Sequence, residues 1–138
     1  MNKNKTLIIA EAGVNHNGNL QQALKLIEIA ANSGADFIKF QTFTAEKLTS
    51  KKAKKASYQI KLDDSDNQYS MLEKLEIPEF WYPILIKKCK EENIKFLTSG
   101  FDEESIDFIE KLNLSFYKIP SGEITNKPYL EHISKKGK

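Results

Sequence analysis

The sequence contains no arginine and only one cysteine among its 138 residues. Without a guanidinium group, any phosphate bound by this chain must be held by lysine, hydroxyl groups and backbone N–H groups. A single cysteine excludes an intramolecular disulfide framework. Because Cys89 follows Leu85 in a helical apolar pattern, we expect it to be a small core residue rather than a nucleophile or a metal ligand.

Long hydrophobic runs are also missing. The apolar run from Leu7 to Ala10 is too short for a signal-peptide core or a membrane span. The formal net charge is +2, from 21 basic and 19 acidic residues that are scattered along the chain. This pattern lacks the basic stripe of a nucleic-acid-binding protein. We therefore expect a cytoplasmic enzyme that binds neither nucleic acid nor a membrane.

What the sequence does contain is an alternation of strand and helix patterns. Helical apolar spacing or a helix-starting residue follows each of the segments that read as strands. The predicted strands are Leu7–Val14, Ala35–Phe43, Lys95–Phe101 and Ser115–Glu123. The predicted helices lie around Leu20–Ala31, from Pro78 through Cys89, after the cap Asp102, and from Pro128 onward.

Four successive βα units favour a parallel sheet in an α/β fold, and a barrel in particular. A barrel needs eight units and roughly 250 residues. We therefore interpret residues 1–138 as a partial TIM-barrel domain, the N-terminal half of a (β/α)8 barrel that stops before strand five. A doubly wound sheet is the alternative, but the turn Glu11–Gly18 lacks the G-x-G-x-x-G spacing of a dinucleotide site.

One connection is much longer than the others. About 34 residues, Thr44 to Ile77, separate the second strand from its helix, where two to six are usual. This segment carries the charged runs Lys51–Lys55 and Asp63–Asp66. We expect the charged runs to be solvated, and the whole excursion is either a surface loop or a lid over the barrel mouth.

Polar residues recur near the carboxyl ends of the predicted strands. Strand alternation puts these sets on shared faces: Ile9, Glu11 and Gly13; Phe37, Lys39 and Gln41; Leu97, Ser99 and Phe101. Interior charges such as Glu11 and Lys39 are costly to bury, so they are either used in catalysis or joined in a buried ion pair. In the fourth segment Lys118 and Ser121 can meet one ligand only if the chain bends near Pro120.

Four blocks of sequence together carry a resemblance to a known family. They are Ile9–Gly18, Ile38–Thr42, Phe96–Asp102 and Tyr117–Glu123. In this order they resemble the signatures of the sialic acid synthase family, which includes N-acetylneuraminate, legionaminate and pseudaminate synthases. In this sequence Thr98-Ser99-Gly100-Phe101 stands where the family usually has Ser-Thr-Pro-Phe, so the proline is lost while both hydroxyls are kept.

The resemblance implies condensation of phosphoenolpyruvate with an N-acylated amino sugar, N-acetylmannosamine or a related hexosamine, and water, giving a nonulosonic acid and phosphate. It implies catalytic roles for Glu11 and Glu123, and substrate contacts for Lys39, Gln41, Ser99, Lys118 and Ser121. It also implies a homodimer that uses Mn²⁺ or Mg²⁺. The metal-binding histidines and a C-terminal antifreeze-like domain would lie outside this chain, so neither His16 nor His132 is assigned to the metal, and the chain alone should be inactive.

Two other functions fit the sequence. A Schiff-base aldolase would use Lys39 or Lys118 as a nucleophile inside a barrel. A half-barrel could also be a non-catalytic module that associates with itself through its open sheet edges. In that state we expect the inner-face residues Ile9, Phe37, Leu97 and Ile119 to be uncovered.

Overall fold

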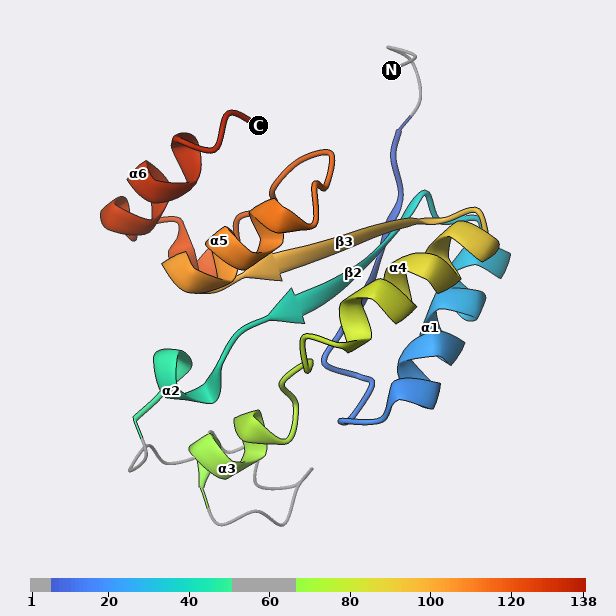
Figure 1. Cartoon of the computed structure of the whole chain (residues 1–138), viewed down its shortest axis with the longest axis horizontal. Helices are drawn as coiled ribbons and strands as arrows, with labels where there is room; N and C mark the ends of the chain where they lie inside the picture. Colours follow the sequence, from blue (N-terminus) through green and yellow to red (C-terminus); the bar gives the residue numbers. More distant parts are fainter. Residues whose placement is uncertain (1–5, 51–66) are drawn as a thin grey trace. The chain divides into compact units, whose positions relative to one another are not determined.

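The computed structural model describes residues 6–50 and 67–138. Three strands and several helices alternate along the chain, as the sequence pattern predicts (Figure 1). The elements are β1 (Ile9–Gly13), α1 (Leu20–Asn32), β2 (Phe37–Thr42), α2 (Ala45–Leu48), α3 (Gln68–Glu73), α4 (Trp81–Glu91), β3 (Lys95–Gly100), α5 (Glu103–Lys111), the 3-10 turn η1 (Ser121–Glu123) and α6 (Lys127–Ser134).

The chain forms two compact units. The first comprises residues 1–40 and 78–98, and the second comprises residues 41–77 and 99–138. The first unit therefore contains β1, α1, α4 and the larger parts of β2 and β3. The second contains the carboxyl ends of β2 and β3 with α2, α3, α5, η1 and α6.

The strands form a three-stranded parallel sheet in the order β1-β2-β3. Ile9 lies opposite Phe37, and Glu11 lies opposite Lys39, so the predicted pairing of strand faces is confirmed at these positions. An irregularity between Glu11 and Gly13 then shifts the register and places Gly13 opposite Phe40. The prediction that Gly13 continues the face of Glu11 is therefore wrong, because a bulge inserts one residue and breaks the alternation.

Helices α1 and α4 cover the sheet in the first unit. The side chain of Asn19 accepts a hydrogen bond from the Gln22 N–H and starts α1, whose buried stripe is Ala23, Ile27 and Ala30. On α4 the buried residues are Trp81, Tyr82, Leu85 and Cys89. The helix begins at Trp81, three residues after the predicted start at Pro78, and the expected core position of Cys89 is confirmed.

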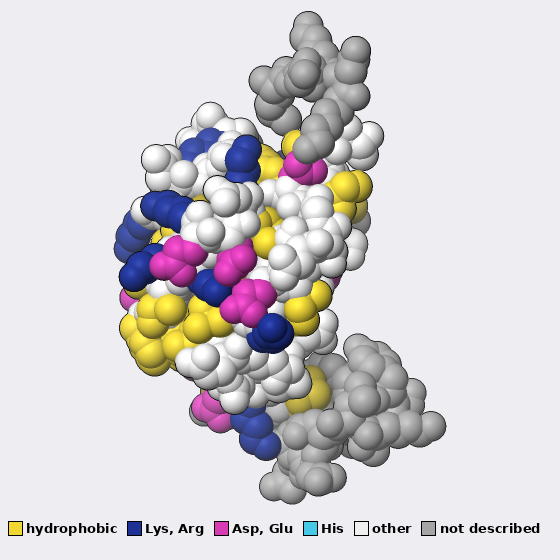
Figure 2. Space-filling view, turned by 90° about the vertical axis from the view of Figure 1, so that its right-hand side faces the viewer, with side chains coloured by type: hydrophobic (Ala, Val, Ile, Leu, Met, Phe, Trp, Pro, Cys, Tyr) yellow, Lys and Arg dark blue, Asp and Glu magenta, His cyan; other side chains and the backbone are white. Residues whose placement is uncertain are grey.

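Charged side chains join the outer surfaces of these two helices. Lys88 on α4 contacts Glu28 on α1 at 2.8 Å and Glu92, the residue after the end of α4, at 2.8 Å. Figure 2 shows basic and acidic side chains intermingled on the face that it draws. Charges of both signs therefore alternate here, and no basic stripe is present on this surface.

The second unit has a core of its own. It consists of Ile106 and Ile109 from α5 and Tyr129 and Ile133 from α6, with partly buried apolar residues around it. The predicted cap Asp102 begins α5, since its carboxylate accepts from the Ser105 N–H at 2.8 Å. Asn126 begins α6 in the same way through the Tyr129 N–H.

The predicted fourth strand is wrong. Residues 115–120 are irregular and 121–123 form the 3-10 turn η1, although the predicted fourth helix is present as α6. Pro120 has no N–H to donate to a strand ladder, and the turn begins directly after it. The expected bend near Pro120 is thus present, but it ends an extended segment rather than distorting a strand.

Two further expectations are settled within the described ranges. Phe37 and Leu97 are buried, at 4% and 1% exposure, so the prediction that they are uncovered is wrong, whereas Ile9 and Ile119 are exposed.

The charged runs of the long excursion, at 51–55 and 63–66, lie outside the described residues. Between 6 and 50 and between 67 and 138, none of the helices has the length and apolar character needed to cross a membrane.

Candidate functional site

In the first unit, the paired strands β1 and β2 bring Glu11 and Lys39 together. The Glu11 carboxylate contacts the Lys39 ammonium at 2.6 Å, as expected for residues that lie opposite each other on adjacent strands. Their environments differ: the Lys39 side chain is 10% exposed, whereas that of Glu11 is 49% exposed. The pair therefore presents a carboxylate to solvent and holds a nearly buried ammonium behind it.

The ion pair that the sequence left open as an alternative is thus present, with only one of its members buried. A purely structural pair gains most when its geometry is closed and both charges are satisfied inside the protein. Here one carboxylate is half-exposed and has room to contact a substrate while it still neutralises Lys39. The geometry is compatible with both a structural and a chemical role, and substitutions of Glu11 and Lys39 separate the two.

The loop that follows β1 is anchored by His16, a residue to which the sequence analysis gave no role. Its side chain is fully buried, and its Nδ1 accepts a hydrogen bond from the Gly18 N–H at 3.1 Å. The neutral ring therefore carries its proton on Nε2. That atom is buried without a hydrogen-bond partner in the described part of the chain, and the His16 ring makes a T-shaped contact with the ring of Trp81.

Burial lowers the pKa of His16 below the ordinary value of 6.5, because the apolar surroundings disfavour the imidazolium. In the unfolded chain the His16 ring takes up a proton near pH 6.5. In the folded protein it does so only at a lower pH. The free energy of unfolding should therefore fall as the pH drops below 6.5, by up to about 1.4 kcal/mol per pH unit for this one group.

Denaturant unfolding between pH 7.5 and 5 checks this expectation, with a His16→Asn variant as the comparison. The slope contributed by His16 should be absent from the variant. A proton NMR titration of the His16 ring provides a second test that does not depend on the variant's stability. A His16 ring that titrates at or above 6.5 would contradict the assigned burial effect.

In the second unit, the carboxyl end of β3 presents Ser99. Its side chain is 1% exposed, and the hydroxyl oxygen has no hydrogen-bond partner among the described residues. Buried hydroxyl groups are normally satisfied, and leaving one without a partner costs free energy. A bound ligand could satisfy an unpaired buried hydroxyl of this kind, and the substrate contact of Ser99 stays a prediction.

The other predicted residues of the second unit lie on three segments. Gln41, on β2, is partly buried, and Lys118 is partly buried in the segment before η1. Ser121 and Glu123 share the η1 turn, so the structure brings these two together. The Glu123 carboxylate accepts a hydrogen bond from the Asn126 side chain at 2.6 Å, which ties it to the start of α6.

Metal ligands were expected to lie outside this chain. Within residues 6–50 and 67–138, no three histidine, cysteine, aspartate or glutamate side chains gather in a way that could hold a metal ion. The described residues therefore do not make a site for Mn²⁺ or Mg²⁺ by themselves. The only cysteine, Cys89, is an inert core residue, because burial raises the pKa of its thiol to about 12.

Comparison with known proteins places these features in a family. The model of the NeuB family matches residues 26–138, which is most of the chain. The chain belongs to the NeuB family. Curated relatives include the N,N'-diacetyllegionaminic acid synthase of Campylobacter jejuni, 57% identical over 97% of this chain and 40% of the relative. The enzyme of the same name from Legionella pneumophila is 51% identical over 94% of this chain and 36% of the relative.

A solved structure of the NeuB type agrees with the fold. The N-acetylneuraminic acid synthetase of Leptospira borgpetersenii matches with a TM-score of 0.81 and 28% identity, over 97% of this chain and 42% of that one. The chain thus spans about two fifths of the length of the relatives it matches. The family expected from the four sequence blocks is confirmed.

Proposed function

We propose that this chain forms the N-terminal part of the catalytic (β/α)8 barrel of a nonulosonic acid synthase. Its relatives include legionaminic, pseudaminic and sialic acid synthases, which supports nonulosonic acid synthesis in general. The proposed reaction joins C3 of phosphoenolpyruvate to the aldehyde carbon of an N-acylated hexosamine, such as N-acetylmannosamine. Water adds to C2, the bond between C2 and the bridging oxygen breaks, and inorganic phosphate leaves.

The observation that carries the proposal is the contact between Glu11 and Lys39. A carboxylate and an ammonium lie 2.6 Å apart on adjacent parallel strands, in a chain whose relatives include synthases. Barrel enzymes place catalytic groups at the carboxyl ends of strands. Lysine is also the only cationic side chain that this arginine-free sequence can offer a doubly charged phosphate ester, apart from protonated histidine.

Roles for the individual residues follow from the family signatures. Glu11 and Glu123 are proposed as catalytic carboxylates, which hold or move protons as water adds to C2. Lys39 and Lys118 are proposed to hold the phosphate and carboxylate of phosphoenolpyruvate. The proposed polar contacts to substrate come from Gln41, Ser99 and Ser121. The divalent metal, Mn²⁺ or Mg²⁺, would be bound by residues that are not in this chain.

Release of phosphate is the simplest test of this function. The assay protein is either a longer protein that carries residues 1–138 or a hybrid in which they replace the matching part of the Campylobacter jejuni synthase. With phosphoenolpyruvate, Mn²⁺ and a panel of N-acylated hexosamines, we expect phosphate release that depends on the sugar. Equal release without any sugar would contradict the proposal.

The same protein distinguishes the aldolase alternative. A Schiff-base enzyme forms an imine between a lysine and the substrate carbonyl, and borohydride reduces that imine to a stable adduct. Lys39 is engaged by the Glu11 carboxylate and is not free for such an attack in this geometry. We therefore expect no borohydride-dependent adduct by mass spectrometry, and an adduct on Lys39 or Lys118 would favour the aldolase. We also propose that the whole protein is a cytoplasmic homodimer.

A further inference from the structure

The position of Ser99 depends on the residue that follows it, Gly100, at the end of β3. Gly100 is buried and lies close against α5. A Cβ atom added at Gly100 would come within 2.9 Å of Cδ1 of Ile106 and 3.1 Å of Cδ1 of Ile109. The absence of a side chain at Gly100 therefore lets the end of β3 approach the α5 side chains closely.

A second contact holds the same backbone unit from α6. The Tyr129 hydroxyl donates a hydrogen bond to the Gly100 carbonyl oxygen at 2.9 Å, and the Tyr129 side chain is 1% exposed. Burial raises the pKa of Tyr129 to about 12, so the hydroxyl keeps its proton and acts as a donor at neutral pH. The buried Tyr129 side chain thus holds the carbonyl group of Gly100, the residue that follows Ser99.

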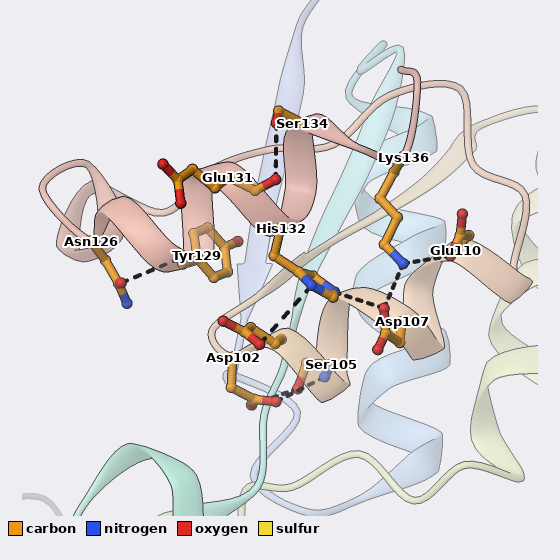
Figure 3. A network of polar contacts seen from close by, with 11 residues as sticks. Asp102, Ser105, Asp107, Glu110, Asn126, Tyr129, Glu131, His132, Ser134 and Lys136 are labelled. Carbon is orange, nitrogen blue, oxygen red and sulfur yellow. Dashed lines mark hydrogen bonds and ion pairs between the residues drawn. The ribbon is translucent and has the colours of Figure 1, made fainter.

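Helix α6 is itself tied firmly to α5. His132 contacts Asp107 at 2.7 Å, and Lys136 bridges Asp107 and Glu110 (Figure 3). His132, which the sequence analysis does not assign to the metal, lies partly exposed on α6, with a side chain that is 25% exposed and bonded to Asp107. In Figure 3 Tyr129 lies on the same helix, one turn before His132. These contacts give the Tyr129 hydroxyl a defined position against the end of β3.

Three described facts concern the last two residues of β3, Ser99 and Gly100. The hydroxyl of Ser99 is buried and unpaired in the described part of the chain, its neighbour Gly100 is packed on α5, and the Gly100 carbonyl is bonded to Tyr129. We infer that Tyr129 is a positioning residue, which acts through the Gly100 carbonyl to aim the Ser99 hydroxyl at substrate. The inference rests on the proposed function, because it is the substrate that satisfies this hydroxyl.

A double-mutant cycle with Ser99→Ala and Tyr129→Phe in the assay protein tests the inference. Ser99→Ala should raise the KM for one of the two substrates. Tyr129→Phe should raise the KM for the same substrate about threefold to tenfold, the scale of one misplaced hydrogen bond, with a smaller change in kcat. If Tyr129 acts through Ser99, then adding Tyr129→Phe to Ser99→Ala should change that KM less than twofold, as expected for strongly coupled residues.

Tyr82→Phe is the matched control, because Tyr82 is also 1% exposed but lies on α4 in the first unit, where its ring packs against Phe96. It should leave both KM values unchanged. Amide hydrogen exchange adds a readout that does not require turnover: Tyr129→Phe, and not Tyr82→Phe, should speed exchange at residues 99–101.

The outcomes separate the two claims. The positioning role is overturned if the parent is active and the KM effects of the two substitutions multiply independently. It is also overturned if Tyr129→Phe leaves both KM values unchanged. In either case the proposed function stands. A parent that releases no phosphate in the presence of any sugar overturns the proposed function, and the substrate-directed role of Tyr129 fails with it.

Discussion

Glu11→Gln is expected to lower sugar-dependent phosphate release by about a hundredfold or more, the usual contribution of a general acid or base. The same substitution should also lower the free energy of unfolding, by about 1–3 kcal/mol, because it leaves the nearly buried Lys39 ammonium without a negative partner. Lys39→Met should lower sugar-dependent phosphate release to a similar extent. Lys39→Met should change the free energy of unfolding by less than about 1 kcal/mol, since water can still hydrate the half-exposed Glu11 carboxylate.

The double variant Glu11→Gln, Lys39→Met distinguishes a catalytic pair from a structural one. Removing both charges leaves no unpaired ammonium, so stability should return close to that of the parent. Activity should stay as low as in the single variants, because the chemistry is missing. Urea unfolding and the phosphate-release assay measure the two properties on the same samples. Recovery of activity together with stability would show that the pair only holds β1 and β2 together.

The isolated 138-residue chain is expected to associate with itself and to release no phosphate. β1 is an edge strand: among the described strands it pairs with β2 alone. Ile8, just before β1, is 54% exposed, and Ile9, the first residue of β1, is 39% exposed. An unpaired edge with exposed apolar side chains is a template for pairing with a second strand. Sedimentation over a concentration series should therefore show a dimer or larger species.

Two isoleucine-to-lysine substitutions locate the surface involved. Ile8→Lys places a charge beside the free edge of β1 and should shift the chain towards monomer. Ile29→Lys is the matched control, because Ile29 is equally exposed, at 52%, but lies on α1. The control should not alter association. A chain that stays monomeric at all concentrations, or that dissociates equally with either lysine, would contradict association through the β1 edge.

The parts of the fold set by local sequence pattern were predictable. Apolar spacing located α1, and the cap Asp102 located α5, since short-range geometry decides both. Strand alternation also placed Glu11 beside Lys39. It failed at Gly13, because a bulge inserts a residue that no simple period records. It failed again at residues 115–123, where apolar content suggested a strand but Pro120 and the η1 turn prevent a regular ladder.

The candidate site residues could be proposed from their types and positions, whereas the contacts that support them could not. Conspicuous polar residues at strand ends pointed to Glu11, Lys39 and Ser99. The role of Tyr129 was hidden, because its hydroxyl reaches a backbone carbonyl 29 residues away, and only tertiary structure reveals that contact. His16 was visible in the sequence, but nothing in its neighbours indicated that it would be fully buried.

The central claim is that these residues belong to a synthase that breaks the bond between C2 and oxygen in phosphoenolpyruvate. The most direct measurement uses phosphoenolpyruvate labelled with ¹⁸O at the bridging oxygen, incubated with the assay protein, Mn²⁺ and an N-acylated hexosamine. Our account predicts that the label leaves with inorganic phosphate and that the product has the combined mass of the sugar and pyruvate. Unlabelled phosphate, or labelled phosphate without a sugar adduct, would contradict it.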